Sequence, residues 1–406
     1  MKRQARRTVL LAIGALLSLV LLAGCGGGAT DGAGTNLGSG PLLAFIGGDG
    51  NLWLAKGDGS LAHAVTVTPC PVNQSCYGPP AWSPDGTSVA LFGPDAATPS
   101  YKDIYVYNRQ GLLQQTIHPV SPLAFGHILW SSDGKQVAYV GNPDALAAGK
   151  SQAPRYALVL MVVSSGAKAG AIILPSPGNA QCGSDPRGGP LGSLVERAVY
   201  GSTGQGLRDT LGWTPDGQKV AINGGSCGTQ VQIVNRGGSA QLLVPVSDPN
   251  ANNVVQAQFS PDGQHLLATQ TSSQQDDILI YNADGSGGKS IYSDTSAPPA
   301  FTPRLGAPSW SADGKLIYFM HGESIWQIGA DGANPHQLVA GSASGNAQKS
   351  EAAPLPSPDG QHLVWNELSL SVADNTARTE LLGGDANGEN AKVIADGGVW
   401  PAYSAK

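Results

Sequence analysis

Charged side chains are scarce in this sequence, at 13% of 406 residues. Acidic residues outnumber basic ones, 29 to 23, and no basic cluster follows the first seven residues. Proteins that bind nucleic acids concentrate positive charge to neutralise phosphates. The composition therefore excludes nucleic acid as a partner.

Metal-binding histidine patterns are also missing. The seven histidines show neither His-x-x-x-His nor His-Glu-x-x-His spacing, which removes the common zinc-protease arrangement. Four of the five cysteines could in principle hold zinc, but their spacings match no known Cys-x-x-Cys pair. We assign no catalytic residue, no metal ligand and no cofactor from the sequence.

Helical periodicity of useful length is absent after residue 24. The chain has instead 56 glycines, 29 prolines and 41% hydrophobic residues distributed in short periodic runs. Many short strands separated by tight turns have this composition, whereas low-complexity disorder does not. The sequence predicts an all-β protein.

One five-residue motif occurs six times, at intervals of about 45 residues in most cases, which is typical of a propeller. The copies are Trp82-Ser-Pro-Asp-Gly86, Trp130-Ser-Ser-Asp-Gly134, Trp213-Thr-Pro-Asp-Gly217, Phe259-Ser-Pro-Asp-Gly263, Trp310-Ser-Ala-Asp-Gly314 and Pro356-Ser-Pro-Asp-Gly360. After each copy come a short apolar run, a variable loop, a second apolar run with a Gly-containing turn, and a third apolar run. Each repeat therefore predicts four strands.

A seventh unit is divided between the two ends of the chain. The segments 42–46, 51–54 and 62–65 look like the second, third and fourth strands of a repeat that lacks its first strand. The segment 399–403 supplies a Trp-bearing first strand. Joining them closes the ring and protects sheet edges. We predict seven four-stranded blades over residues 41–406, with six as the alternative.

The first 24 residues predict a secretion signal. Four cations precede an apolar stretch, Val9–Leu22, that is too short to span a bilayer as a helix. The segment ends in Leu22-Ala-Gly-Cys25, which resembles a bacterial lipobox, and an uncleaved membrane anchor is the alternative. Lipid on Cys25 and a Gly-rich flexible tether over 25–40 would then attach the ring to a membrane.

Cysteine usage fits an exported protein. With Cys25 assigned to lipid, Cys70, Cys76, Cys182 and Cys227 remain, an even number with three possible connectivities. We favour Cys70 with Cys76, inside one loop, and Cys182 with Cys227, in loops of one blade. Peptide mapping under oxidised and reduced conditions tests this pairing.

The repeated Asp-Gly pairs could suggest six metal sites, but their surroundings are ordinary turn chemistry. Pro presets φ, Asp bonds local amides and Gly tolerates positive φ. The recurring Trp position is likewise explained by packing between blades. We interpret as structural turn residues Asp85, Gly86, Asp133, Gly134, Asp216, Gly217, Asp262, Gly263, Asp313, Gly314, Asp359 and Gly360.

Loop lengths differ between the two faces of the predicted ring. Turns after the first and third strands are short, whereas those after the second and fourth are long and irregular, and up-and-down strand order places the long set on one face. This set includes 93–102, 141–155, 175–208 and 366–378. Binding usually resides on loops held by a rigid scaffold, so we expect the ligand on this long-loop face and the mouth of the central channel. A dispensable insertion is the alternative for 175–208.

The six motifs and the Asp-Gly turns after third strands, such as Asp331-Gly332, resemble the WD40-like (PD40) repeat of TolB-type propellers. The resemblance covers residues 41–406 and implies the propeller fold. Some members of this family carry an α/β domain before the ring, and that domain engages envelope partners. In this chain we expect only the tether at the same place. Related rings accompany peptidases or act as lyases with His-bound metal.

We therefore expect an exported, monomeric propeller, anchored by lipid to a bacterial membrane and facing the periplasm or the cell exterior. It would bind an envelope protein or glycan through its long-loop face without catalysis. The alternative is a carbohydrate-active lyase or hydrolase with its site at the channel mouth.

Overall fold

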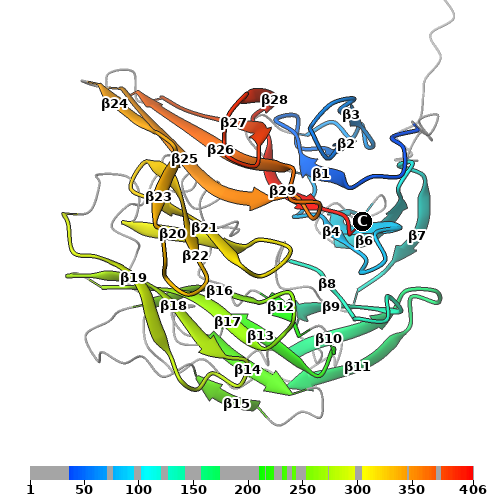
Figure 1. The fold of residues 1–406 in the computed structure, drawn as a ribbon. Helices are drawn as coiled ribbons and strands as arrows, with labels where there is room; N and C mark the ends of the chain where they lie inside the picture. The colour runs from blue at the N-terminus through cyan, green and yellow to red at the C-terminus, as the bar shows by residue number, and fades with distance from the viewer. Residues whose placement is uncertain are drawn as a thin grey trace, which may run out of the picture.

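The computed structural model describes residues 36–70, 76–95, 102–119, 127–141, 157–173, 210–214, 216–223, 231–235, 240–243, 253–272, 274–297, 304–344, 347–371 and 376–405. Within these ranges the chain forms strands and no helix, so none that could cross a membrane. Seven antiparallel sheets are arranged in a ring (Figure 1). The fold is a seven-bladed β-propeller, which confirms the blade count predicted from the repeats.

Three blades form the first part of the ring in chain order. Blade I comprises β4 (Ala81–Trp82), β5 (Ser88–Pro94), β6 (Lys102–Asn108) and β7 (Leu113–Ile117). Blade II comprises β8 (Leu129–Trp130), β9 (Gln136–Gly141), β10 (Ala157–Val162) and β11 (Lys168–Ile173). Blade III comprises β12 (Thr210–Trp213), β13 (Lys219–Asn223), β14 (Val231–Asn235) and β15 (Ala240–Leu243).

Four further blades complete the ring. Blade IV comprises β16 (Asn253–Phe259), β17 (His265–Thr271), β18 (Asp276–Asn282) and β19 (Lys289–Asp294). Blade V comprises β20 (Leu305–Trp310), β21 (Leu316–His321), β22 (Ser324–Gly329) and β23 (His336–Val339). Blade VI comprises β24 (Ser342–Ser344), β25 (Ala347–Pro356), β26 (His362–Ser371), β27 (Thr376–Asp385) and β28 (Lys392–Asp396). Blade VII comprises β29 (Val399–Tyr403), β1 (Leu42–Ile46), β2 (Leu52–Lys56) and β3 (His63–Ala64).

Tryptophans near the ends of the first strands join neighbouring blades. Around the ring, β29, β4, β8, β12, β16, β20 and β25 follow one another in contact, and β29 also contacts β26 and β27 of blade VI. In three blades the indole Nε1 donates a hydrogen bond to a backbone carbonyl in the first strand of the preceding blade. The pairs are Trp82 with Ala402 at 3.1 Å, Trp130 with Ala81 at 2.9 Å and Trp310 with Gln258 at 3.3 Å. These bonds give the repeated tryptophan a role between blades, beyond burying apolar area.

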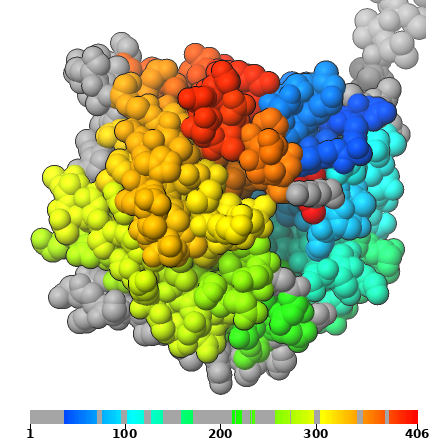
Figure 2. All heavy atoms as spheres, viewed as in Figure 1, coloured from blue at the N-terminus to red at the C-terminus, as the bar shows by residue number. Residues whose placement is uncertain are grey.

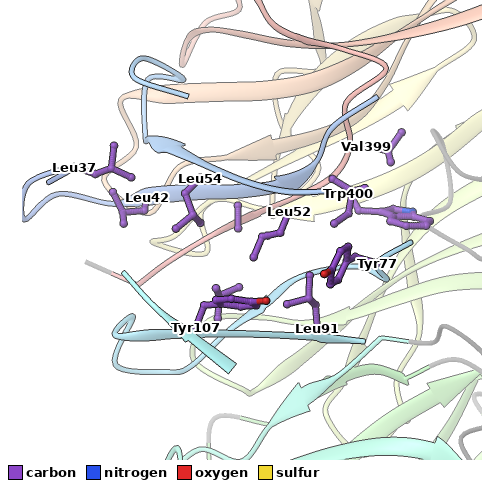
Figure 3. Close-up of a cluster of buried hydrophobic side chains, with 12 residues drawn as sticks. Leu37, Leu42, Leu52, Leu54, Tyr77, Leu91, Tyr107, Val399 and Trp400 are labelled. Atoms are coloured by element: carbon purple, nitrogen blue, oxygen red, sulfur yellow. The ribbon is translucent and has the colours of Figure 1, made fainter. Parts of the chain in front are cut away.

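Blade VII closes the ring by pairing the two ends of the described chain. β29 runs antiparallel to β1, and the Leu42 amide donates to Ser404 Oγ at 2.8 Å. In Figure 2 the blue and red segments accordingly lie side by side. Leu52, Leu91 and Tyr107 meet in a buried cluster that seals blade VII against blade I (Figure 3). The predicted closure is confirmed.

Packing begins slightly earlier than the predicted tether boundary suggests. Leu37 lies within the segment 25–40, yet it is 4% exposed and belongs to the same cluster as Leu42 and Leu54. Residues 1–35, including the predicted signal and Cys25, lie outside the described part of the chain.

Blade VI departs from the predicted four-strand pattern. The segment 366–378, predicted as a long irregular loop, instead continues β26 and opens β27, apart from residues 372–375, which are outside the described ranges. These two strands pair without a break from His362↔Asp385 to Ser371↔Thr376. A short fifth strand, β24, pairs with the first part of β25. The loop prediction was wrong because Glu367–Ser371 alternates polar and apolar residues, which is a strand pattern.

Candidate binding surface

The Asp-Gly turns lie at the hairpins between first and second strands, as predicted. In blade V, Ser311 Oγ donates to Asp313 Oδ1 at 2.7 Å, and the Lys315 amide donates to the same oxygen at 3.1 Å. The hydrogen bond from Ser311 is the main reason why the pKa of Asp313 is lowered. Gly314 has φ +69°. The Asp313 carboxylate therefore accepts its hydrogen bonds from residues of its own turn.

The same turn recurs in the other repeats. A Ser or Thr hydroxyl donates to the Asp of its motif at Asp85, Asp133, Asp216, Asp262 and Asp359, and the glycine that follows has φ between +66° and +70°. No group of three or more His, Cys, Asp or Glu side chains that could hold a metal ion occurs in the described ranges.

One of the two expected cysteine pairs falls on described residues. Cys70 and Cys76 form a disulfide with a Cα–Cα distance of 5.7 Å. Cys182 and Cys227 lie outside the described residues. The same is true of the loop 175–208 and of all but the ends of 93–102 and 141–155.

The described feature that distinguishes the long-loop face is the extension of blade VI. β26 and β27 each have ten residues, whereas β21 and β22 of blade V have six and meet at His321↔Ser324. Four more residue pairs lengthen a hairpin by about 13 Å at the usual rise per residue. We call residues 347–352, 366–371 and 376–381 the blade VI extension. Its last four pairs, 368–371 with 376–379, reach beyond the hairpin of blade V.

Three glutamates lie opposite one another across this extension. Glu351 on β25 pairs with Glu367 on β26, which pairs with Glu380 on β27. Residues directly opposite in a sheet share one face, so the three side chains form a row. The whole chain contains only six glutamates. The pairing register of β25, β26 and β27 brings three of these six glutamates together, and the sequence alone does not reveal that register.

The inner two carboxyl groups of the row are buried. Glu351 is 5% exposed and Glu367 is 8% exposed. Trp365 Nε1 donates to Glu351 Oε2 at 2.7 Å, and Lys349 Nζ donates to Glu367 Oε1 at 2.6 Å. Burial, and next the charge of Glu367, raise the pKa of Glu351 to about 7. Glu351 therefore carries its proton in about half of the molecules at pH 7, an arrangement able to hold or transfer one proton.

The outer end of the row, Glu380, is partly exposed and charge-paired. Arg378 Nη2 lies 3.2 Å from Glu380 Oε1, and Arg378 Nε donates to Asp396 Oδ1 at 3.0 Å. The Arg378 side chain is 62% exposed. Exposed pairs like these contribute little to stability and are available to a ligand.

A second polar cluster lies between blades IV and V on the same face. His321 Nε2 is 3.1 Å from Asp294 Oδ2, and the Tyr292 hydroxyl is 3.2 Å from His321 Nδ1. The Trp326 ring centroid lies 4.9 Å from that of His321. These groups bond mainly to one another, so the cluster joins two blades.

A buried ion pair fixes the nearby strand ends. Arg304 Nη1 lies 3.3 Å from Asp276 Oδ1, with both side chains at most 6% exposed, and donates to the Ser272 carbonyl at 3.1 Å. Burial raises the pKa of Asp276 despite this partner. Blades IV and V therefore offer a rigid base beside the extension.

Comparison with known proteins supports the fold. An oligogalacturonate lyase in complex with manganese is 13% identical over 82% of this chain and 82% of its own, with a TM-score of 0.51. The β-propeller domain of the Trilobed protease from Pyrococcus furiosus, described as having an open velcro topology, is 12% identical over 88% of this chain and 97% of that domain, with a TM-score of 0.50. TolB from Acinetobacter baumannii is 14% identical over 92% of this chain and 68% of its own, with a TM-score of 0.46.

The similarities to the lyase and to the protease domain show a shared propeller architecture and nothing finer, because a fold hosts many functions. No protein-family model and no curated protein matches this chain.

Proposed function

We propose that this protein is a non-catalytic binding module of the bacterial envelope, and that it holds a protein or glycan through its long-loop face. The observation that carries the proposal is the blade VI extension, which places Lys349 and Arg378 beyond the neighbouring hairpin of blade V, with Glu380 paired to Arg378 at its base. Rigid scaffolds that present such projections commonly use them for recognition.

The envelope location belongs to the same proposal. The lipobox-like Cys25 would carry the anchor, and the segment up to residue 36 would be the tether to the ring. The Cys70–Cys76 disulfide supports an oxidising compartment, since disulfides persist outside the cytosol.

In-cell photo-crosslinking tests the binding face. Photoreactive residues replace Lys349 and Thr376, which are exposed on the extension, and Asp284, an exposed turn residue between β18 and β19, serves as the control on the opposite face. We expect a defined adduct from the first two positions only, identified by mass spectrometry as protein or by glycan staining. Equal capture from Asp284, or none from the extension, contradicts the proposal.

The alternative function is a carbohydrate-active hydrolase or lyase. The observation that favours it is the acid–carboxylate pair Glu351 and Glu367, because such pairs perform general acid and base catalysis. Incubation of the purified protein with a panel of acidic and neutral polysaccharides tests it. Product release by the unmodified protein, lost in Glu367→Gln and kept in Glu380→Gln, would replace the non-catalytic proposal with this one.

A further inference from the structure

The Glu351–Glu367 pair lies where the blade VI extension leaves the ring. β25 carries Glu351, pairs with β26 on one side, and pairs with β24 on the other through Ser342↔Lys349. The Glu351 amide donates to the Glu323 carbonyl at 2.8 Å, in the turn between β21 and β22. Glu351 therefore sits at the junction of blade V, the extension and the added strand.

The charged and titratable groups around the pair come from every adjoining strand. Lys349 lies on β25 itself, and Ser369 Oγ on β26 is 3.3 Å from Glu367 Oε1. β27 brings Glu380 and Arg378, and β28 brings Asp396 beyond them. Blade V contributes Glu323 from its turn and Tyr318, which shares a buried cluster with Trp365.

One cation, Lys349, serves both carboxyl groups of the pair: it bonds directly to Glu367 and acts on Glu351 only through its charge. Lys349 Nζ bonds to Glu367, while Glu351 receives the neutral Trp365 indole and touches the apolar cluster. Two ionised carboxylates directly opposite on neighbouring strands repel each other, and little water screens them at 5% and 8% exposure. The proximity of Glu367, through its charge and through hydrogen bonding to the protonated acid, helps to raise the pKa of Glu351.

We propose that Glu351 and Glu367 share a single proton and that its release to solvent loosens the pairing of β25 with β26, which makes the blade VI extension a proton-operated switch. With the proton in place, the pair carries one negative charge, balanced by Lys349. Without the proton, two negative charges face each other at the base of the extension. β24 is then weakened as well, because in the described sheet it pairs only with β25. The proposed switch lies entirely within blade VI, so it can be tested without a bound ligand.

Carboxyl NMR tests the shared proton directly. With selectively ¹³C-labelled glutamate, the full-length chain gives six side-chain carboxyl signals. We expect one of them to titrate with a midpoint near pH 7 and to vanish in Glu351→Gln. Glu380→Gln, which alters the exposed end of the row, should leave the midpoint unchanged. If every glutamate titrates below pH 5.5, the shared proton does not exist.

Hydrogen exchange tests the mechanical consequence. Between pH 6 and pH 8, after correction for the intrinsic exchange rate, we expect amides of 347–352 and 366–371 to lose protection about tenfold, because the protonated fraction of a group with a midpoint near pH 7 falls by about that factor over this range. The β22 amides serve as the internal reference. In Glu351→Gln these backbone amides should stay protected at both pH values. The side-chain amide of the glutamine can still accept a hydrogen bond from the Trp365 indole and donate one to Glu367. An equal loss in that variant, or none in the unmodified protein, would overturn the switch.

Discussion

At the scale of single residues, the repeated tryptophan shows how one side chain can serve the whole ring. Trp130 is 7% exposed, and its indole donates to the Ala81 carbonyl of the preceding blade. Trp213 occupies the same position in blade III, but its Nε1 has no hydrogen-bond partner among the described residues. The two residues therefore separate the contribution of the hydrogen bond from that of the buried ring.

This difference predicts unequal costs for one substitution. Trp130→Phe removes the indole hydrogen bond to the Ala81 carbonyl, which Trp213 does not make, so it should lower the free energy of unfolding by about 1 kcal/mol more than Trp213→Phe does. Urea denaturation of both variants measures the difference. Equal losses would show that the bond between blades contributes nothing beyond the burial of the ring.

At the scale of elements, two parts of the structure respond to pH in opposite directions. The turn aspartates, such as Asp313 and Asp262, have pKa values lowered mainly by hydrogen bonds from Ser311 and Ser260. Their stabilisation is present above the unfolded pKa of 3.8 and is lost as the pH falls through the lower folded value. Glu351 has a raised pKa, so its stabilisation is complete below 4.5 and is lost as the pH rises through about 7.

We therefore predict maximum stability at about pH 4, with losses on both sides. Glu351→Gln should abolish much of the loss that accumulates as the pH rises from 4.5 to above 7, which amounts in total to about 3 kcal/mol for a shift from 4.5 to about 7. The acidic loss should remain in this variant. Thermal unfolding across the pH range measures both effects, and an unchanged alkaline loss in Glu351→Gln would contradict the prediction.

The hairpins also show which elements the sequence could predict. Turns were predictable because Asp and Gly determine them locally, as Gly314 and its φ of +69° illustrate. The longer strands of the extension could also have been predicted, since Leu368 and Leu370 alternate with polar residues. The glutamate row was not, because facing Glu351 with Glu367 requires the register of β25 on β26, and a β-bulge between Ala352 and Leu355 shifts that register.

At the scale of the whole molecule, the ring depends on a strand distant in sequence from its partners. β29 covers one edge of β1, and Val399 and Trp400 join the cluster between blades VII and I. The sequence predicted this closure because segment 399–403 supplied the first strand that segments 42–46, 51–54 and 62–65 lacked. Ring closure was thus the most predictable long-range contact in the molecule.

Ending the chain after Gly398 should open the ring. The variant would leave the β1 edge unpaired and expose Leu43 and Phe45, which are fully buried in the intact protein. We expect aggregation on size-exclusion chromatography and loss of cooperative unfolding. Ending the chain after Ser404, which keeps β29 and the bond to Leu42, should preserve both properties. A monomeric, cooperatively folding variant that ends at Gly398 would refute this role of β29.

The pairing of β29 with β1 also sets the order in which the molecule can mature. Leu42 and Ser404, which bond in the closed blade, are 362 positions apart, so at about 5 to 20 residues per second their synthesis is separated by roughly 20 to 70 s. During that interval blade VII lacks its innermost strand, and the apolar side chains of β1 have no permanent cover. A cell that exports this chain would have to shield an unfinished blade throughout its production, and translocation before closure would leave the last step of folding to the far side of the membrane.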